Sequence, residues 1–282
     1  MENITIFGAG TMGRGIAHVA ALGGYNVVLS DVSDDILRQA LEVARKNMEK
    51  GIERGKVTRP DMDAALGRIA LVTDPAEAAK EADLVIEAII EELDVKLELF
   101  LNLDNICKED TIFATNTSAL SITELAAVTR RPDRFVGAHF FNPVHIMRLI
   151  EIVKGLETSD DTVRCLAEVI ERMGKESVIV TDSPGFATSR INVMIGNEAF
   201  YMLQEGVASA EDIDKAIKLG LNHPMGPFEL VDLVGLDIRL NVLKDLHKRL
   251  GEKFRPCPLL EKYVNAGRLG RKVGRGVYEY GD

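Results

Sequence analysis

Apolar positions in the first two thirds of the chain follow two alternating patterns, short continuous runs and longer stretches with a helical period. The runs predict strands at residues 3–7, 26–30, 69–72, 83–88, 111–114, 135–140, 149–153 and 176–180. Helical periods lie between them at residues 11–22, 34–54, 92–103 and 160–173. The runs Leu84-Val85-Ile86 and Val178-Ile179-Val180 are typical of strands buried on both faces of a parallel sheet. Strands that alternate with helices predict a doubly wound, mostly parallel α/β sheet.

The pattern changes after Ser183-Pro184-Gly185, because only helical periods follow, at residues 187–205, 210–219, 227–234, 237–250 and 258–266. We therefore predict two domains, residues 1–183 with the sheet and residues 184–282 as a smaller all-α domain. The connection from residue 31 to residue 68 is much longer than one crossover helix requires. It predicts a helical hairpin inserted beside the sheet, with its turn near Thr58-Arg59-Pro60, and insertions of this size are usually functional.

Composition and charge narrow the possible functions. The 282 residues include 34 Lys and Arg against 44 Asp and Glu, and the formal charge of −10 argues against a general binder of nucleic acids or anionic membranes. No apolar run approaches the ~18 residues of a membrane span, and the start has no basic segment, so we expect neither a membrane anchor nor a signal peptide. Three widely spaced cysteines predict neither a disulfide framework nor a metal site, and they favour a cytoplasmic protein.

Gly8-Ala9-Gly10-Thr11-Met12-Gly13 is a G-x-G-x-x-G motif between a predicted strand and a predicted helix. In this context Gly8 allows the tight turn, Gly10 lets the backbone approach a pyrophosphate, and Gly13 allows close packing of helix and strand. Asp31 ends the second strand eighteen residues after Gly13, where its carboxylate would accept hydrogen bonds from ribose hydroxyls and repel a 2′-phosphate. The motif therefore predicts a Rossmann-type domain that binds NAD rather than NADP. The alternative is an ordinary glycine-rich turn in a protein without a cofactor.

Among the five histidines, His139 has the best position for acid–base chemistry. It lies near the end of a predicted strand, and the carboxyl ends of parallel strands open onto the ligand crevice. Glu151 lies within another apolar strand, where a carboxylate must be paired or functional. Pairing with Glu151 would fix the tautomer of His139 and stabilise its protonated form. A purely structural His–Glu pair, or an exposed strand end, is the alternative.

Several motifs, taken in their order, carry a family resemblance. They are the glycine-rich motif, Asn116-Thr117-Ser118, His139-Phe140-Phe141-Asn142-Pro143, Pro184-Gly185-Phe186 and His223-Pro224-Met225-Gly226-Pro227-Phe228-Glu229-Leu230. On these motifs, essentially the whole chain resembles the short-chain L-3-hydroxyacyl-CoA dehydrogenase family, especially the stand-alone bacterial 3-hydroxybutyryl-CoA dehydrogenases. The resemblance implies an oxidoreductase of fatty acid metabolism that reversibly converts (S)-3-hydroxyacyl-CoA and NAD to 3-oxoacyl-CoA and NADH.

The resemblance also implies roles for individual residues. His139 would be the general base, Glu151 would orient it, and Ser118 would hydrogen-bond the substrate oxygen. Asn142 would support the nicotinamide side of the site and contact the substrate. The implied cofactor contacts are Gly8, Gly10, Thr11, Met12, Gly13, Asp31, Glu91, Lys96, Asn116, Ser118, Asn142 and Lys272. Family members form homodimers through the helical domain and place the active site in the cleft between the domains.

Basic residues in the predicted hairpin suggest where coenzyme A would bind. Lys46, Lys50 and Arg54 recur every four residues and so share one helical face. An acidic protein needs such a stripe to receive the phosphates of CoA, and Lys50 and Arg54 match positions of basic CoA contacts in the family. The alternative is a solvated face that also carries glutamates.

One position departs from the family pattern. Ser189 stands where the family commonly has a substrate-polarising asparagine after the Pro-Gly-Phe motif, so substrate fit at Ser189 is in question. Two other functions stay open at this point. The first is a dehydrogenase for a hydroxy acid or sugar acid without CoA, and the second is a non-catalytic dinucleotide-binding protein.

Overall fold

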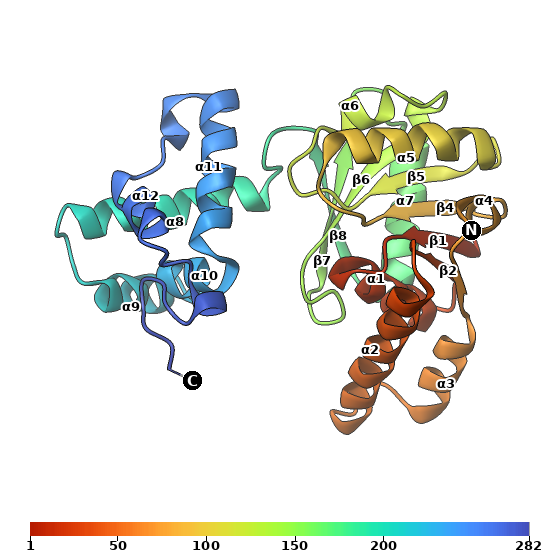
Figure 1. The fold of residues 1–282 in the computed structure, drawn as a ribbon, viewed down its shortest axis with the longest axis horizontal. Helices are drawn as coiled ribbons and strands as arrows, with labels where there is room; N and C mark the ends of the chain where they lie inside the picture. The colour runs from red at the N-terminus through yellow and green to blue at the C-terminus, as the bar shows by residue number, and fades with distance from the viewer. Residues whose placement is uncertain (282) are drawn as a thin grey trace. The chain divides into compact units, whose positions relative to one another are not determined.

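The computed structural model describes residues 1–281, which form two compact units (Figure 1). The N-terminal unit comprises Met1–Ser183, and the helical unit begins at Pro184.

The N-terminal unit is built on one eight-stranded sheet. Its strands are β1 (Asn3–Phe7), β2 (Asn26–Ser30), β3 (Ile69–Val72), β4 (Leu84–Glu87), β5 (Ile112–Thr115), β6 (Phe135–Phe140), β7 (Leu149–Lys154) and β8 (Glu176–Thr181). Their order is β3-β2-β1-β4-β5-β6-β7-β8, and every pairing is parallel except the antiparallel pairing of β6 with β7. The prediction of a doubly wound, mostly parallel sheet is therefore confirmed. The strand order reverses between β1 and β4, and ligands bind at such switch points in open α/β sheets.

Helices accompany the strands of this unit. They are α1 (Thr11–Leu22), α2 (Asp34–Glu53), α3 (Arg59–Gly67), α4 (Pro75–Ala79), α5 (Leu93–Ile106), α6 (Ile122–Ala126), the 3₁₀ turn η1 (Pro132–Arg134) and α7 (Asp160–Arg172). Helices α2 and α3 form the predicted hairpin, which projects beyond the sheet in Figure 1. Thr58 starts α3 with a capping box that includes Asp61. The sequence pattern missed α4 and α6, because five residues are too few to display a helical period.

One expectation about burial is wrong. β4 is buried along its whole length, as its apolar run predicted, but β8 is the edge strand of the sheet. Val178 is 43% exposed and Ile179 is 61% exposed. An apolar β-branched run therefore predicted a strand correctly in both cases, while position in the sheet decided which strand was covered on both faces.

The helical unit has its own core. Its elements are α8 (Thr188–Gln204), α9 (Ala210–Gly220), α10 (Pro227–Val234), α11 (Leu236–Leu250), η2 (Glu252–Phe254), α12 (Pro258–Asn265) and η3 (Arg271–Val273). Phe200 and Phe228 pack edge to face at its centre. Buried Asp232 accepts hydrogen bonds from the backbone N–H groups of Val277 and Tyr278 and so fixes the closing segment. Within residues 1–281, no helix has the length and apolar character needed to cross a bilayer.

Candidate active site

The glycine-rich turn between β1 and α1 is shaped for close backbone contact. Gly8 has φ +96°, and a Cβ there would lie 2.5 Å from the carbonyl oxygen of Ala88. A Cβ on Gly13 would lie 1.7 Å from the Gly8 carbonyl oxygen. A Cβ on Gly10 would meet nothing within 4 Å, and Gly10 caps α1 without a side-chain hydrogen bond. Gly8 and Gly13 thus serve the protein's own packing, whereas Gly10 leaves room for a phosphate at the positive end of α1.

A cavity of about 770 Å³ opens at this turn. Gly8, Gly10, Thr11, Met12 and Asp31 are among the residues that line it. The Asp31 carboxylate accepts hydrogen bonds from the backbone N–H of Ala9 at 2.7 Å and of Val32 at 2.8 Å. These bonds hold the carboxylate at the cavity wall, where the sequence places the partner of a ribose. The residues present therefore fit a dinucleotide.

His139 and Glu151 face each other across β6 and β7. The antiparallel register pairs the two residues directly, and His139 Nδ1 lies 2.7 Å from Glu151 Oε2. His139 is 6% exposed and Glu151 is 0% exposed, so the pair is shielded from water. The ring of Phe141 lies against that of His139, with 4.5 Å between centroids. The expected pairing is present, and its burial makes the electrostatic interaction stronger than it would be at the surface.

Glu91 positions the segment that carries Ser118. Its Oε1 accepts hydrogen bonds from Thr117 Oγ1 at 2.5 Å and from the backbone N–H of Ser118 at 2.9 Å. Lys96 Nζ lies 3.1 Å from Glu91 Oε2. Burial opposes ionisation of Glu91, but Lys96 and these hydrogen bonds outweigh it, so the pKa of Glu91 lies below its ordinary value. Glu91 therefore acts as an ionised anchor for Ser118.

Lys96 also pairs with Glu87, a residue that the sequence analysis did not single out. Its Nζ lies 2.6 Å from Glu87 Oε1, and the two side chains are 1% and 0% exposed. Burial raises the pKa of Glu87, and the charge of Lys96 opposes that rise. Lys96 was expected to contact a cofactor, but its ammonium lies in the protein interior between Glu87 and Glu91. A carboxylate within an apolar strand, the signal used for Glu151, would also have identified Glu87.

Two asparagines flank the end of β6. Asn116 Oδ1 accepts a hydrogen bond from the backbone N–H of Phe140 at 3.0 Å, which ties the end of β5 to the residue after His139. Asn142 is exposed and begins the turn toward β7, and its bond to Pro143 is a cis peptide. Asn116 thus holds the strand that carries His139, while Asn142 is accessible at the same end of the sheet.

Lys50 and Arg54 line a second cavity of the N-terminal unit, about 370 Å³ in volume, which we call the basic pocket. Lys46 was expected on the same face, but it does not line this pocket and lies 3.7 Å from Glu42. Lys46 is therefore paired at the surface, whereas Lys50, about one helical turn further on, and Arg54, about two turns further on, reach the pocket. In residues 1–281, no group of three or more His, Cys, Asp or Glu side chains is arranged to hold a metal ion.

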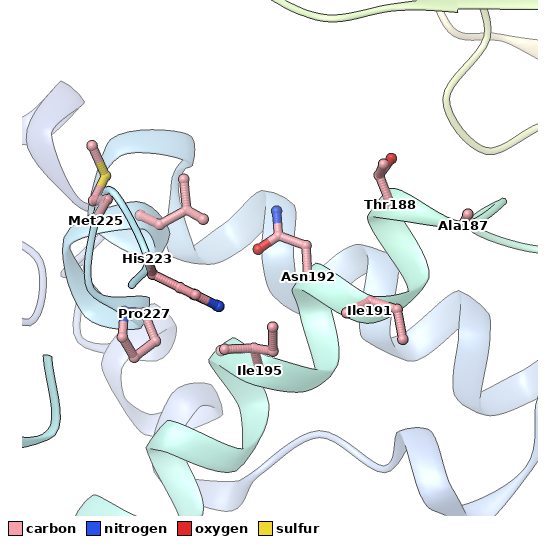
Figure 2. A pocket seen from close by; sticks show the side chains of 10 residues that line it. Ala187, Thr188, Ile191, Asn192, Ile195, His223, Met225 and Pro227 are labelled. Carbon is pink, nitrogen blue, oxygen red and sulfur yellow. The ribbon is translucent and has the colours of Figure 1, made fainter. Parts of the chain in front are cut away.

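Ser189 and Lys272 belong to the helical unit. A cavity of about 430 Å³ lies beside α8, and Figure 2 shows Asn192, Ile195 and His223 pointing into it. Ser189 is half-buried in the first turn of α8 and does not line this cavity. Lys272 Nζ lies 2.6 Å from Asp237 Oδ1 in an ion pair within the unit. Substrate contact by Ser189 and cofactor contact by Lys272 stay predictions.

Comparison with known proteins agrees with this geometry. The family model of the 3-hydroxyacyl-CoA dehydrogenase NAD binding domain matches residues 3–183, and that of the 3-hydroxyacyl-CoA dehydrogenase C-terminal domain matches residues 185–280. The chain is 47% identical over 281 residues to a probable 3-hydroxybutyryl-CoA dehydrogenase of Bacillus subtilis, covering 99% of this chain and 98% of that protein. It is 43% identical over 278 residues to a 3-hydroxybutyryl-CoA dehydrogenase of Clostridioides difficile, covering 98% and 99%.

A solved structure shares the whole fold. The crystal structure of (S)-3-hydroxybutyryl-CoA dehydrogenase from Ralstonia eutropha superposes with a TM-score of 0.97 at 44% sequence identity, covering 100% of both chains. The resemblance inferred from the motifs, and the choice of NAD as cofactor, are confirmed. The chain therefore belongs to the 3-hydroxyacyl-CoA dehydrogenase family and is an NAD-dependent oxidoreductase.

Proposed function

We propose that the protein catalyses the reversible oxidation of (S)-3-hydroxyacyl-CoA to 3-oxoacyl-CoA, with 3-hydroxybutyryl-CoA as its substrate. The observation that carries the proposal is the buried pair of His139 and Glu151, 2.7 Å apart, in a unit that also has a dinucleotide cavity. The relatives named for this reaction support the choice of substrate.

The glycine-rich turn and Asp31 would hold the cofactor. Gly10 and the first N–H groups of α1 would bind the pyrophosphate, and the Asp31 carboxylate would accept hydrogen bonds from the ribose hydroxyls. Each Asp31 oxygen accepts one backbone hydrogen bond and has a second lone pair for a hydroxyl. When bound, NAD supplies the acceptor for the hydride that leaves the hydroxyl-bearing carbon.

His139 would move the proton of the reaction. A hydrogen on Nδ1 donates to Glu151, which leaves the lone pair of the neutral ring on Nε2. In the oxidation, His139 Nε2 would take the hydroxyl proton, and the buried Glu151 carboxylate would stabilise the imidazolium that forms. In the reduction, the same imidazolium would return the proton to the oxygen.

Ser118 and Asn142 would position the reacting groups. Glu91 fixes the backbone of Ser118, so its hydroxyl can donate to the substrate oxygen from a defined place. Asn142 would contact the nicotinamide side and the substrate from the turn after β6. Lys96 would contribute indirectly, because its positive charge keeps Glu91 ionised. Lys50 and Arg54 would bind phosphates of CoA.

The two units would have different roles. Residues 1–183 would bind NAD, and residues 184–282 would supply dimer contacts and part of the substrate site. Exposed apolar side chains of the helical unit, among them Leu219 at 75% and Leu221 at 63%, support a homodimer through this unit. Sedimentation velocity tests the dimer, and a monomer at micromolar concentration would contradict it.

The three cysteines, none in a disulfide, suit a cytoplasmic enzyme of fatty acid metabolism.

An NADH absorbance assay with acetoacetyl-CoA tests the reaction itself. His139→Ala should lower kcat by roughly 10²–10⁴-fold, the usual contribution of a positioned acid–base group, and Glu151→Gln should lower it in the same direction. NADH affinity should change little in either variant. His247→Ala is a matched control, since His247 forms an exposed pair with Glu252 at 3.0 Å in the helical unit.

Two outcomes would contradict the proposal. Near-wild-type turnover by folded His139→Ala protein would remove the acid–base assignment. Equal activity on acetoacetate without CoA would favour a dehydrogenase of free hydroxy acids.

A further inference from the structure

The basic pocket contains more positive groups than Lys50 and Arg54. It lies among α1, α2, the turn after α2, the turn after β6 and the connection from α7 to β8. Its basic side chains are His18, Lys50, Arg54, Lys56, His145 and Lys175, and no aspartate or glutamate within residues 1–281 lines it. In a chain of formal charge −10, this pocket is a concentrated positive site that attracts an anion.

Two of these side chains are imidazoles in contact. The rings of His18 and His145 stack with centroids 5.5 Å apart and an angle of 13° between their planes. His18 is 3% exposed, and its Nδ1 has no hydrogen-bond partner in the part of the chain that the structure describes. Burial, followed by the charges of His145 and Lys175, lowers the pKa of His18 to about 4. His18 is therefore a neutral platform beneath His145 at neutral pH.

His145 is held in place by Lys175. The Lys175 ammonium donates hydrogen bonds to the carbonyl oxygens of Val144 at 2.6 Å and Met147 at 2.8 Å, on either side of His145. Burial, followed by the charges of Lys175, Arg54 and Lys50, lowers the pKa of His145. The Lys175 bonds hold the backbone on both sides of His145, and the stack on His18 places its ring where neighbouring cations oppose protonation.

We propose that His145 is a proton-linked phosphate contact, which takes up a proton when a phosphate group of CoA occupies the basic pocket and then donates a charge-assisted hydrogen bond to it. This inference rests on the proposed function, since CoA is the ligand. A phosphate brings a charge of about −1.5 to −2, which offsets the cations that oppose protonation. Charge-assisted bonds of this kind are about twice as strong as neutral ones.

The sign of the linkage follows from the proton uptake. Because the complex holds one more proton than the free protein, a lower pH favours binding, up to tenfold for each unit by which the phosphate raises the pKa of His145. The second ionisation of the phosphate, near pH 6, acts in the opposite direction. The experiment must therefore compare variants that bind the same probe.

Isothermal titration with adenosine 3′,5′-bisphosphate, the nucleotide part of CoA, tests this linkage. Saturating NAD is present throughout so that the probe does not enter the glycine-rich site. Titrations at pH 7 in two phosphate-free buffers of different ionisation enthalpy count the protons taken up. His145→Phe keeps a ring on His18 but cannot titrate, and His247→Phe is a control far along the chain.

We expect wild type and His247→Phe to take up more protons than His145→Phe, by a measurable fraction of one proton per probe. We also expect His145→Phe to bind the probe about 3–10-fold more weakly at pH 6, with a smaller difference at pH 8. His145→Gln, which can donate but cannot titrate, should show the same loss of proton uptake. Equal proton uptake by wild type and His145→Phe would overturn the inference.

Steady-state kinetics provide a second test, and their outcomes distinguish a failure of this inference from a failure of the proposed function. In His145→Phe, the KM for acetoacetyl-CoA should rise several-fold relative to the KM for acetoacetyl-pantetheine. An unchanged ratio of the two KM values would refute a phosphate contact even though the enzyme reduces acetoacetyl-CoA. Failure of the wild-type protein to reduce acetoacetyl-CoA would instead refute the proposed function.

Discussion

Replacing Lys96 with methionine should destabilise the N-terminal unit by an amount that depends on pH. Methionine fills most of the volume of the lysine but leaves Glu87 without its opposing charge. Glu87 is 0% exposed and keeps its hydrogen bonds from Thr115 Oγ1 at 2.6 Å and from the backbone N–H of Ile89 at 2.7 Å. Removal of one partner of a buried ion pair typically costs about 3–5 kcal/mol.

The cost is bounded because Glu87 can take up a proton. Its ordinary pKa is 4.5, so protonation at pH 7 costs about 3.4 kcal/mol, at ~1.36 kcal/mol per pH unit. Burial already raises the pKa of Glu87, and loss of Lys96 should raise it further. A carboxyl group with a raised pKa in the folded state favours folding at low pH and loses this advantage as pH rises. The deficit of Lys96→Met should therefore be about 3 kcal/mol at pH 7 and under about 1 kcal/mol at pH 5.

Urea unfolding followed by circular dichroism measures this deficit, since the chain has no tryptophan to serve as a fluorescent probe. The double variant Lys96→Met with Glu87→Gln should recover much of the loss at pH 7, because the fully buried carboxylate is gone, while the side chain of Glu91, the other partner of Lys96, is 41% exposed and stays hydrated. Lys108→Met is the matched control. Lys108 lies 3.3 Å from Glu81 but is 37% exposed, so this change should cost at most about 1 kcal/mol at either pH. A deficit of equal size at pH 5 and pH 7 would show that Glu87 is not the group that the lysine neutralises.

The remaining predictions concern ligands. Asp31→Ala should raise the KM for NADH about tenfold, since hydrogen bonds to a charged group contribute about 1.5 kcal/mol or more. The variant should also prefer NADH over NADPH less strongly than the wild type does. Equal use of both cofactors by the wild type would argue against a ribose contact by Asp31. Lys50→Ala should raise the KM for acetoacetyl-CoA several-fold and for acetoacetyl-pantetheine less, whereas Lys46→Ala, outside the basic pocket, should affect neither. Ser189→Asn should change the ratio of activities on four-carbon and longer acyl-CoA substrates without changing NADH affinity. Ratios equal to those of the wild type in both Ser189→Asn and Ser189→Ala would show that this side chain does not face the substrate.

Local signals were sufficient for the elements and for the glycine-rich turn. Short strands, helix caps and the spacing from Gly13 to Asp31 depend on neighbouring residues, so they can be read along the chain. The ends of several elements shifted by one to three residues, as in α5, which was expected at 92–103 and lies at Leu93–Ile106. Helix ends depend on competing hydrogen bonds and are less well determined by the apolar period.

The pairing of His139 with Glu151 could also be predicted from the sequence. A carboxylate in an apolar strand needs a partner, and a histidine at a strand end was the best candidate. The same rule applied to Glu87 would have called for a partner without identifying Lys96. Only the fold shows that Lys96 lies inside the protein and that Glu91 anchors Ser118, because these contacts join β4, α5 and the segment after β5.

Some sequence patterns look alike but lie in different surroundings in the protein, and only the tertiary structure shows this difference. The runs at Leu84 and Val178 look alike in sequence, yet one lies in a central strand and the other in an edge strand. Lys46 and Lys50 lie one turn apart on the same helix, yet only Lys50 lines the basic pocket. The sequence determined which side chains favour a strand, a helix or a charged face, because those preferences arise within a few residues. Burial, charge pairing and the stack of His18 on His145 depend on elements distant in sequence, and only folding brings these elements into contact.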